Sequence, residues 1–86
     1  MNEQLVHVRL FAAAAEAAGY DEVDVPAGSL SSILAEVGKA APDASRWQSV
    51  LQRCSVLVDG LVADPARAES VGPGVRVDVL PPFAGG

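Results

Sequence analysis

An amphipathic stripe in the middle of this 86-residue chain constrains its fold more than any other feature. Apolar residues recur there at positions i, i+3, i+4 and i+7, the spacing that places side chains on one face of an α-helix. The stripe consists of Leu30, Ile33, Leu34 and Val37. Ser29 is a suitable N-cap, and we expect Gly38 to end the helix. A helix with one apolar face needs an apolar layer on which to pack.

The segments on both sides of this helix supply such a layer, because their apolar residues alternate with a period of two, as in β-strands. The pattern occurs in residues 5–11, 22–25, 55–62 and 75–80. Within the third segment, Asp59-Gly60 separates two apolar runs and predicts a hairpin with a two-residue type I′ turn. In the last segment we expect the valines to face the core and Arg76, Asp78 and Leu80 to face away.

Two shorter helices complete the expected elements. Residues 12–18 are rich in alanine, and Asp43 is placed to cap a helix in which Trp47 packs on the core. Strands interrupted by one main helix predict an α+β fold, with that helix across one face of a mixed sheet. We therefore expect one domain over residues 1–80 and a flexible C-terminal tail over residues 81–86.

The segment from Leu80 to Gly86 has features suited to chemistry carried out by another protein. Pro81 and Pro82 lack backbone N–H groups and have a fixed φ, so they end sheet pairing and stiffen the exit from the domain. Gly85 and Gly86 have no Cβ, so another protein's backbone can approach them closely. A carboxylate at Gly86 would be ionised at neutral pH, since the reference pKa of an α-carboxyl group is about 3.3–3.7. The alternative is a disordered tail that happens to contain glycines.

Composition and motifs argue against several functions of the domain itself. A formal net charge of −5 argues against nucleic-acid binding, and no apolar run approaches the length of a membrane span. The single cysteine, Cys54, cannot form an internal disulfide, which favours a reducing compartment and hence the cytoplasm; we expect it to be buried as a small hydrophobic residue. His7, the only histidine, is expected at the surface. We find no phosphate loop, metal-ligand cluster or nucleophile–base pair, so we expect no metal and no complete active site.

Several motifs together resemble one family. They are Leu80-Pro-Pro-Phe-Ala-Gly-Gly86, the opening Val8-Arg-Leu-Phe11, the alanine-rich segment up to Gly19, Ser29-Leu-Ser-Ser-Ile-Leu34 and Val56-Leu-Val-Asp-Gly60. With them the chain is similar to the MoaD/ThiS family over nearly its whole length. It is most like the MoaD branch, the small, sulfur-carrying subunits of molybdopterin synthase. The double proline shortly before the diglycine is the most specific part of this resemblance.

The resemblance implies a β-grasp, ubiquitin-like fold and a role in molybdenum cofactor biosynthesis. An adenylating enzyme of the MoeB/ThiF type would use ATP to convert the Gly86 carboxylate into an acyl-adenylate. A persulfide from a sulfurtransferase would then displace AMP and leave a thiocarboxylate. The tail would enter the active site of the molybdopterin synthase large subunit and donate sulfur to the dithiolene of molybdopterin. Gly86 would carry the reacting atoms, Gly85 and Ala84 would give clearance, and no cofactor would be bound permanently.

The same resemblance implies where partner proteins dock. In the β-grasp fold the first and last strands are parallel neighbours, so their C-terminal ends lie together. We therefore expect an apolar patch that both partners contact, formed by Phe11, Leu80, Pro81, Pro82 and Phe83. The alternative is that Phe11 caps the core.

Three other functions remain open at this point. Sulfur carriers for thiamine thiazole or cysteine synthesis also end in two glycines. A ubiquitin-like protein modifier would join its terminal glycine to a lysine as an isopeptide. An interaction module with the same fold would have an inert tail.

Overall fold

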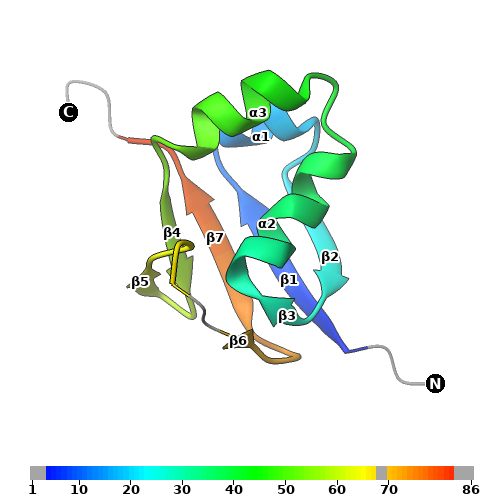
Figure 1. The fold of residues 1–86 in the computed structure, drawn as a ribbon, viewed down its shortest axis with the longest axis vertical. Helices are drawn as coiled ribbons and strands as arrows, with labels where there is room; N and C mark the ends of the chain where they lie inside the picture. Colours follow the sequence, from blue (N-terminus) through cyan, green and yellow to red (C-terminus); the bar gives the residue numbers. More distant parts are fainter. Residues whose placement is uncertain (1–3, 68–69, 83–86) are drawn as a thin grey trace.

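A five-stranded mixed sheet, with one long helix packed across one of its faces, forms the domain (Figure 1). The structure is a computed structural model that describes residues 4–67 and 70–82. The strands follow the order β2-β1-β7-β4-β5 in the sheet. Their bounds are β1 (Leu5–Leu10), β2 (Glu22–Pro26), β4 (Ser55–Val58), β5 (Leu61–Ala63) and β7 (Arg76–Leu80). The helices are α1 (Ala13–Ala18), α2 (Leu30–Lys39) and α3 (Ala44–Leu51).

The two central strands come from opposite ends of the sequence. β1 and β7 are parallel, and the register pairs Val8 with Val77 and Leu10 with Val79. β2 and β4 flank them in the antiparallel sense. The parallel pairing brings the C-terminal ends of β1 and β7 to the same end of the sheet (Figure 1). This confirms the strand neighbours expected from the resemblance.

The core lies between α2 and the sheet. All members of the amphipathic stripe are at most 3% exposed, and they pack on buried valines of β1 and β7. Each fully buried aliphatic side chain contributes about 1.5–3 kcal/mol through removal of apolar surface from water. The Ser29 hydroxyl oxygen accepts a hydrogen bond from the Ser32 amide, with an N···O distance of 3.1 Å, so Ser29 is the N-cap as predicted.

One boundary of this helix was predicted incorrectly. α2 runs on to Lys39, so Gly38 lies inside the helix and does not end it. Trp47, which is 1% exposed, lies against this glycine, and a Cβ added at Gly38 would lie 2.5 Å from the indole Cδ1. Gly38 therefore makes room for the buried Trp47 ring, whose place in the core was predicted.

Local signals set the smaller elements. The Asp43 carboxylate caps α3 by accepting from the Arg46 amide at 3.2 Å. Asp59 and Gly60 have φ values of 48° and 85°, and both signs are those of a type I′ turn. A short strand pair, β3 (Gly28–Ser29) with β6 (Ser70–Val71), was not predicted. The last strand begins one residue later than expected, at Arg76.

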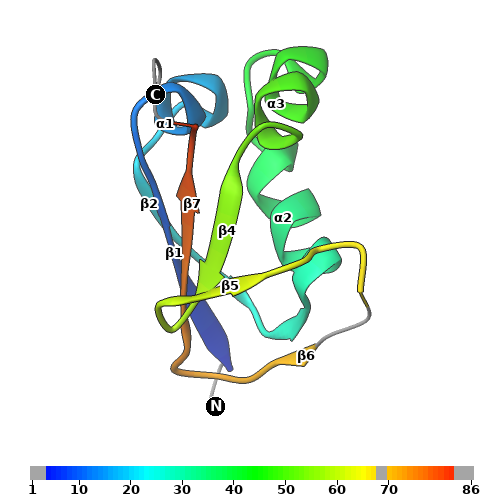
Figure 2. The same ribbon diagram turned by 90° about the vertical axis from the view of Figure 1, so that its left-hand side faces the viewer.

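The sheet is covered on one face only by the described elements. In Figure 2 the sheet is seen nearly edge-on, with α2 and α3 on one side of it. Side chains alternate along each strand, and residues paired across the sheet share a face. We call the surface opposite α2 the open face. No helix in the described part of the chain is long and apolar enough to span a bilayer.

Candidate functional site

The open face is a mixed surface of charged and apolar side chains. The strand registers place there Leu5, His7, Arg9, Glu22, Asp24, Leu57, Val62, Arg76, Asp78 and Leu80. The charged residues lie on the central strands and on β2. Apart from Leu5, which begins β1 at the opposite end, the apolar residues lie toward the end of the sheet where the chain leaves β7, and toward the β5 edge.

Phe11 and Leu80 come directly after the paired residues Leu10 and Val79 of the two parallel strands, so they are neighbours at this end of the sheet. The Phe11 amide donates to the Val79 carbonyl oxygen at 3.1 Å, which extends the β1–β7 pairing by one step. Phe11 is 37% exposed, so it is a surface residue and does not cap the core. Leu80 and Pro81 are half-buried, and Pro82 is exposed. These residues form the base of the tail, while Phe83, Ala84, Gly85 and Gly86 lie outside the described residues.

A half-buried ion pair lies directly beside Phe11 and Leu80. Asp78 is 6% exposed, and it accepts from Arg9 twice, Nε to Oδ1 at 2.9 Å and Nη2 to Oδ2 at 3.3 Å. Arg76 approaches the same carboxylate at 3.6 Å. The hydrogen bonds that Arg9 donates to the Asp78 carboxylate raise the pKa of Arg9, so the guanidinium stays charged. A buried carboxylate is tolerated only when it is paired in this way, so the pair fixes the Arg9 side chain.

Asp78 faces away from the core, as predicted, and is nevertheless buried. Alternation gives the face of a residue but not what covers that face. The burial of Asp78 could have been predicted only from the register of the parallel strands, in which Arg9 and Asp78 are partners. Opposite charges at paired positions indicate a cross-strand ion pair.

A second charged cluster lies on the β2 flank of the open face. His7 Nδ1 is 2.8 Å from Asp24 Oδ1, and His7 Nε2 is 3.0 Å from Glu22 Oε1. The hydrogen bond with Asp24 is the main reason why the pKa of His7 is raised from 6.5. The prediction that His7 is a surface residue is confirmed, and its two ring nitrogens are both partnered.

The apolar surface extends further than the sequence indicated. Leu57 pairs with Val62 in the hairpin and is a diagonal neighbour of Leu80 on β7. Val62 is 79% exposed. We call Phe11, Leu80, Leu57 and Val62 the apolar stripe of the open face. The hairpin residues were missed because the pairing of β4 with β7 is a long-range contact that local patterns do not reveal.

The tail base is also hollowed on its helix side. A cavity of about 180 Å³ is lined there by Ala13, Val50, Arg53, Pro81 and Pro82. We call it the tail notch. Surface features on both sides of Pro81 and Pro82 therefore mark the point from which the chain continues toward Gly86.

The sequence profile described as the ThiS family matches residues 8–86. The chain belongs to the ThiS family. The match extends through Gly86, so the diglycine falls within the part of the chain that the family profile describes. A search of curated proteins gave no significant match.

Solved structures similar to this ThiS-family domain show its fold. A crystal structure of SAMP1 from Haloferax volcanii is 25% identical, with a TM-score of 0.73, over 95% of this chain and 99% of that one. A second crystal structure, of H. volcanii small archaeal modifier protein 1, is 23% identical, with a TM-score of 0.70, over 92% and 98%. A Pyrococcus furiosus protein described as molybdopterin converting factor subunit 1 is 22% identical, with a TM-score of 0.72, over 92% and 98%. The domain is therefore a β-grasp, ubiquitin-like domain of the ThiS/MoaD type, as predicted.

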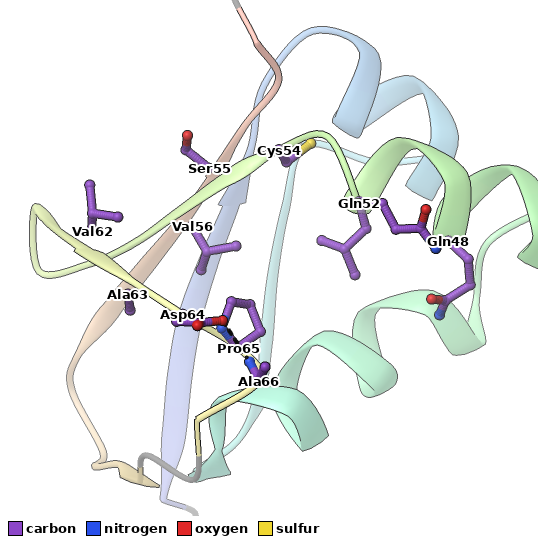
Figure 3. Close-up of a pocket in the computed structure, with 11 residues that line it drawn as sticks. Gln48, Gln52, Cys54, Ser55, Val56, Val62, Ala63, Asp64, Pro65 and Ala66 are labelled. Atoms are coloured by element: carbon purple, nitrogen blue, oxygen red, sulfur yellow. Dashed lines mark hydrogen bonds between the residues drawn. The ribbon is translucent and has the colours of Figure 1, made fainter.

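A wider hollow in this ThiS-family domain carries no catalytic arrangement. It has a volume of about 500 Å³ and lies between α3 and the β4–β5 hairpin (Figure 3). Cys54, which was expected to be buried, is half-buried and lines this hollow, and its thiol donates to the Val50 carbonyl oxygen at 3.2 Å. Burial raises the pKa of this thiol, which disfavours the reactive thiolate. Within residues 4–67 and 70–82, no group of three or more histidine, cysteine or acidic residues is arranged to hold a metal.

Proposed function

We propose that this ThiS-family domain is a sulfur carrier, and that the carboxylate of Gly86 is its functional group. The observation that carries the proposal is the parallel pairing of β1 with β7. It brings two apolar residues of distant segments, the exposed Phe11 and the half-buried Leu80, beside the base of the tail. A partner that binds there is positioned to act on residues beyond Pro82. The match of the family profile through Gly86 supports this role of the tail.

The proposed chemistry begins with activation, because a carboxylate is a poor acyl donor. A Gly86 carboxylate oxygen bonds to the α-phosphorus of ATP and pyrophosphate leaves, which gives an acyl-adenylate. The terminal sulfur of a persulfide then attacks the acyl carbon and AMP leaves. Reduction of the acyl disulfide by a thiol releases a thiocarboxylate on Gly86. A MoeB/ThiF-type adenylating enzyme supplies the ATP site and a sulfurtransferase supplies the persulfide, both in the cytoplasm.

In this proposal the chain presents its tail to the partner enzymes, and those enzymes supply the catalytic groups. Six residues such as 81–86, if fully extended, would span on the order of 20 Å, enough to enter a deep pocket. Ordering them costs roughly 1–2 kcal/mol of backbone entropy per residue. The apolar stripe of the open face offsets this cost by docking on the partner. Ala84 and Gly85 are small enough to pass through a narrow channel.

We propose molybdopterin as the product that receives the sulfur, with the molybdopterin synthase large subunit as the second partner. Pro81-Pro82 before the diglycine supports this choice, as does the similarity to the P. furiosus protein. Sulfur carriers for thiazole or cysteine synthesis would share the first steps and differ in the acceptor. Binding of the synthase large subunit in a pull-down experiment separates these carriers.

A protein modifier is the second candidate, and the similarity to the small archaeal modifier protein favours it. The same acyl-adenylate would form, but a lysine amine would receive the glycyl group. The two functions therefore diverge only after activation of Gly86.

Intact-mass analysis tests these functions together. The domain is incubated with ATP, the adenylating enzyme of the same organism and a sulfur source. Replacement of one oxygen by sulfur at Gly86 supports the carrier, and isopeptide conjugates support the modifier. An unchanged mass without conjugates overturns both and leaves an interaction module with an inert tail.

A further inference from the structure

We propose that the tail notch is a docking site for the adenylating enzyme, which inserts an apolar side chain into the notch and places a carboxylate against Arg53. This inference rests on the proposed function only for its first step, the adenylation of Gly86. That step is common to the carrier and the modifier.

The position of the notch supplies the first argument. Its walls are Ala13 of α1, Val50 of α3, Arg53 just after α3, and the two prolines of the tail base. The apolar stripe lies on the sheet side of the same prolines. An enzyme that surrounds the tail beyond Pro82 must contact both sides of the tail base. The notch is therefore continuous with the proposed docking surface, yet it belongs to a different layer of the fold.

The size and lining of the notch indicate what enters it. Apolar cavities of about 150 Å³ accommodate a benzene molecule. At about 180 Å³, with walls of alanine, valine and proline, the notch fits one aromatic or branched aliphatic side chain. Such anchored side chains dominate the binding free energy of many interfaces.

Charge supplies the second argument. Four of the six basic residues lie within 4.0 Å of a carboxylate oxygen: Arg9, Lys39, Arg46 and Arg76. Arg53 is exposed, and within residues 4–67 and 70–82 it has no such partner. An exposed cation at the rim of an apolar cavity is complementary to a partner carboxylate beside an apolar anchor. Arg67, the sixth basic residue, is likewise outside these ion pairs among the described residues, but it does not line the notch.

The experiment measures carrier-dependent ATP–pyrophosphate exchange by the adenylating enzyme of the same organism. Arg53→Glu is compared with Arg67→Glu, which makes the same charge change in the turn after β5. We expect Arg53→Glu to raise the KM for the domain about tenfold with kcat unchanged. Added salt should reduce the difference in KM between this variant and the wild-type domain, because it screens the charges. Arg67→Glu should change KM less than about twofold.

The apolar part of the site is tested by filling it. Ala13→Leu fills the notch from an exposed position, and Ala35→Leu adds the same side chain at an exposed position on α2. We expect only Ala13→Leu to raise KM, while both variants keep the wild-type unfolding midpoint. Equality of Arg53→Glu with Arg67→Glu overturns the carboxylate contact, and equality of the two leucine variants overturns the apolar contact. If the wild-type domain itself supports no exchange, the proposed adenylation fails, which is a distinct result.

Discussion

The guanidinium carbon of Arg9 lies 5.4 Å from the centre of the Phe11 ring. The same guanidinium is held by the buried carboxylate of Asp78 on the neighbouring strand. A cation over an aromatic face contributes about 0.5–1 kcal/mol at an exposed site. The exposed aromatic ring beside the tail base is therefore positioned in part by a polar pair within the sheet, and apolar packing is not its only support.

Replacing Asp78 by Asn should destabilise the domain. The amide keeps the shape but loses the charge that two arginines share, and its NH2 group cannot accept from Arg9. We expect the free energy of unfolding in urea to fall by about 1–2 kcal/mol, which allows for the partial exposure of Arg9. Asp21→Asn, at an exposed position, is the control and should change it by less than about 0.5 kcal/mol. Equal effects of the two changes would contradict a structural role of the ion pair between Arg9 and Asp78.

Replacing Phe11 by Ala should weaken partner binding without unfolding the domain. Phe11 is exposed, so its removal leaves little cavity, whereas loss of an aromatic contact at an interface costs about 2 kcal/mol or more. We expect at least about a tenfold loss of affinity for the molybdopterin synthase large subunit by calorimetry. Leu61→Ala is the control, because Leu61 is 75% exposed and lies outside the apolar stripe. Unchanged affinity of the Phe11 variant would remove this residue from the docking surface.

Local patterns predicted most elements of the fold, because the spacing of apolar and turn residues within one segment indicates the secondary structure of that segment. The amphipathic stripe specified α2, and Asp59-Gly60 specified the hairpin turn. What escaped prediction depends on contacts between distant segments. Asp78 is buried because Arg9 lies opposite it, and the two-residue strands β3 and β6 are too short for a periodic pattern.

The residues of the candidate site also fall into those that could be predicted and those that depend on long-range contacts. Phe11 and Leu80 were placed together because the parallel pairing of the first and last strands could be inferred from the family resemblance. Leu57 and Val62 could not be added without the register between β4 and β7. The tail notch was not predicted either, because it forms where α1, α3 and the tail base meet. The roles of Ala84, Gly85 and Gly86 remain predictions.

Gly38→Ala should destabilise the domain even though alanine is the better helix former. Alanine gains about 1 kcal/mol of helix propensity over glycine. The new methyl group, however, would lie 2.5 Å from the buried ring of Trp47, and overpacking of this kind costs about 1–3 kcal/mol. We expect a net loss of up to about 2 kcal/mol in the free energy of unfolding. Gly72→Ala, where an added Cβ meets open space, is the control; a stabilised Gly38 variant would show that the ring moves aside freely.

The cluster around His7 should make stability depend on pH. Asp24 and Glu22 face the imidazole from β2, Arg76 and Arg9 lie nearby on the open face, and the pKa of His7 is raised. A raised pKa in the folded state means that the stabilisation is fully present below 6.5, the unfolded value, and is lost as the pH rises through the folded pKa.

This pH dependence can be isolated with His7→Gln. We expect the difference in unfolding free energy between wild type and variant to shrink, by less than about 1 kcal/mol, as the pH rises from about 5.5 to about 8.5. NMR titration of the imidazole should show its pKa falling in Asp24→Asn. An imidazole pKa that does not change in Asp24→Asn would contradict the assigned cause.

Deleting Gly86 should abolish sulfur loading while the fold is retained, because the remaining terminus is displaced from the reacting position by about one residue length, roughly 3.3–3.6 Å. Loading is measured by intact mass, and folding by the thermal unfolding midpoint.

Deletion of Ala84 is the matched control, since it shortens the tail equally but preserves Gly85-Gly86 at its end. If both deletions abolish loading equally, reach alone limits the reaction. If loading persists without Gly86, its carboxylate is not the acceptor of sulfur. Greater residual loading in the Ala84 deletion would assign a separate role to the glycines, the clearance that lets the active site close around the acyl group.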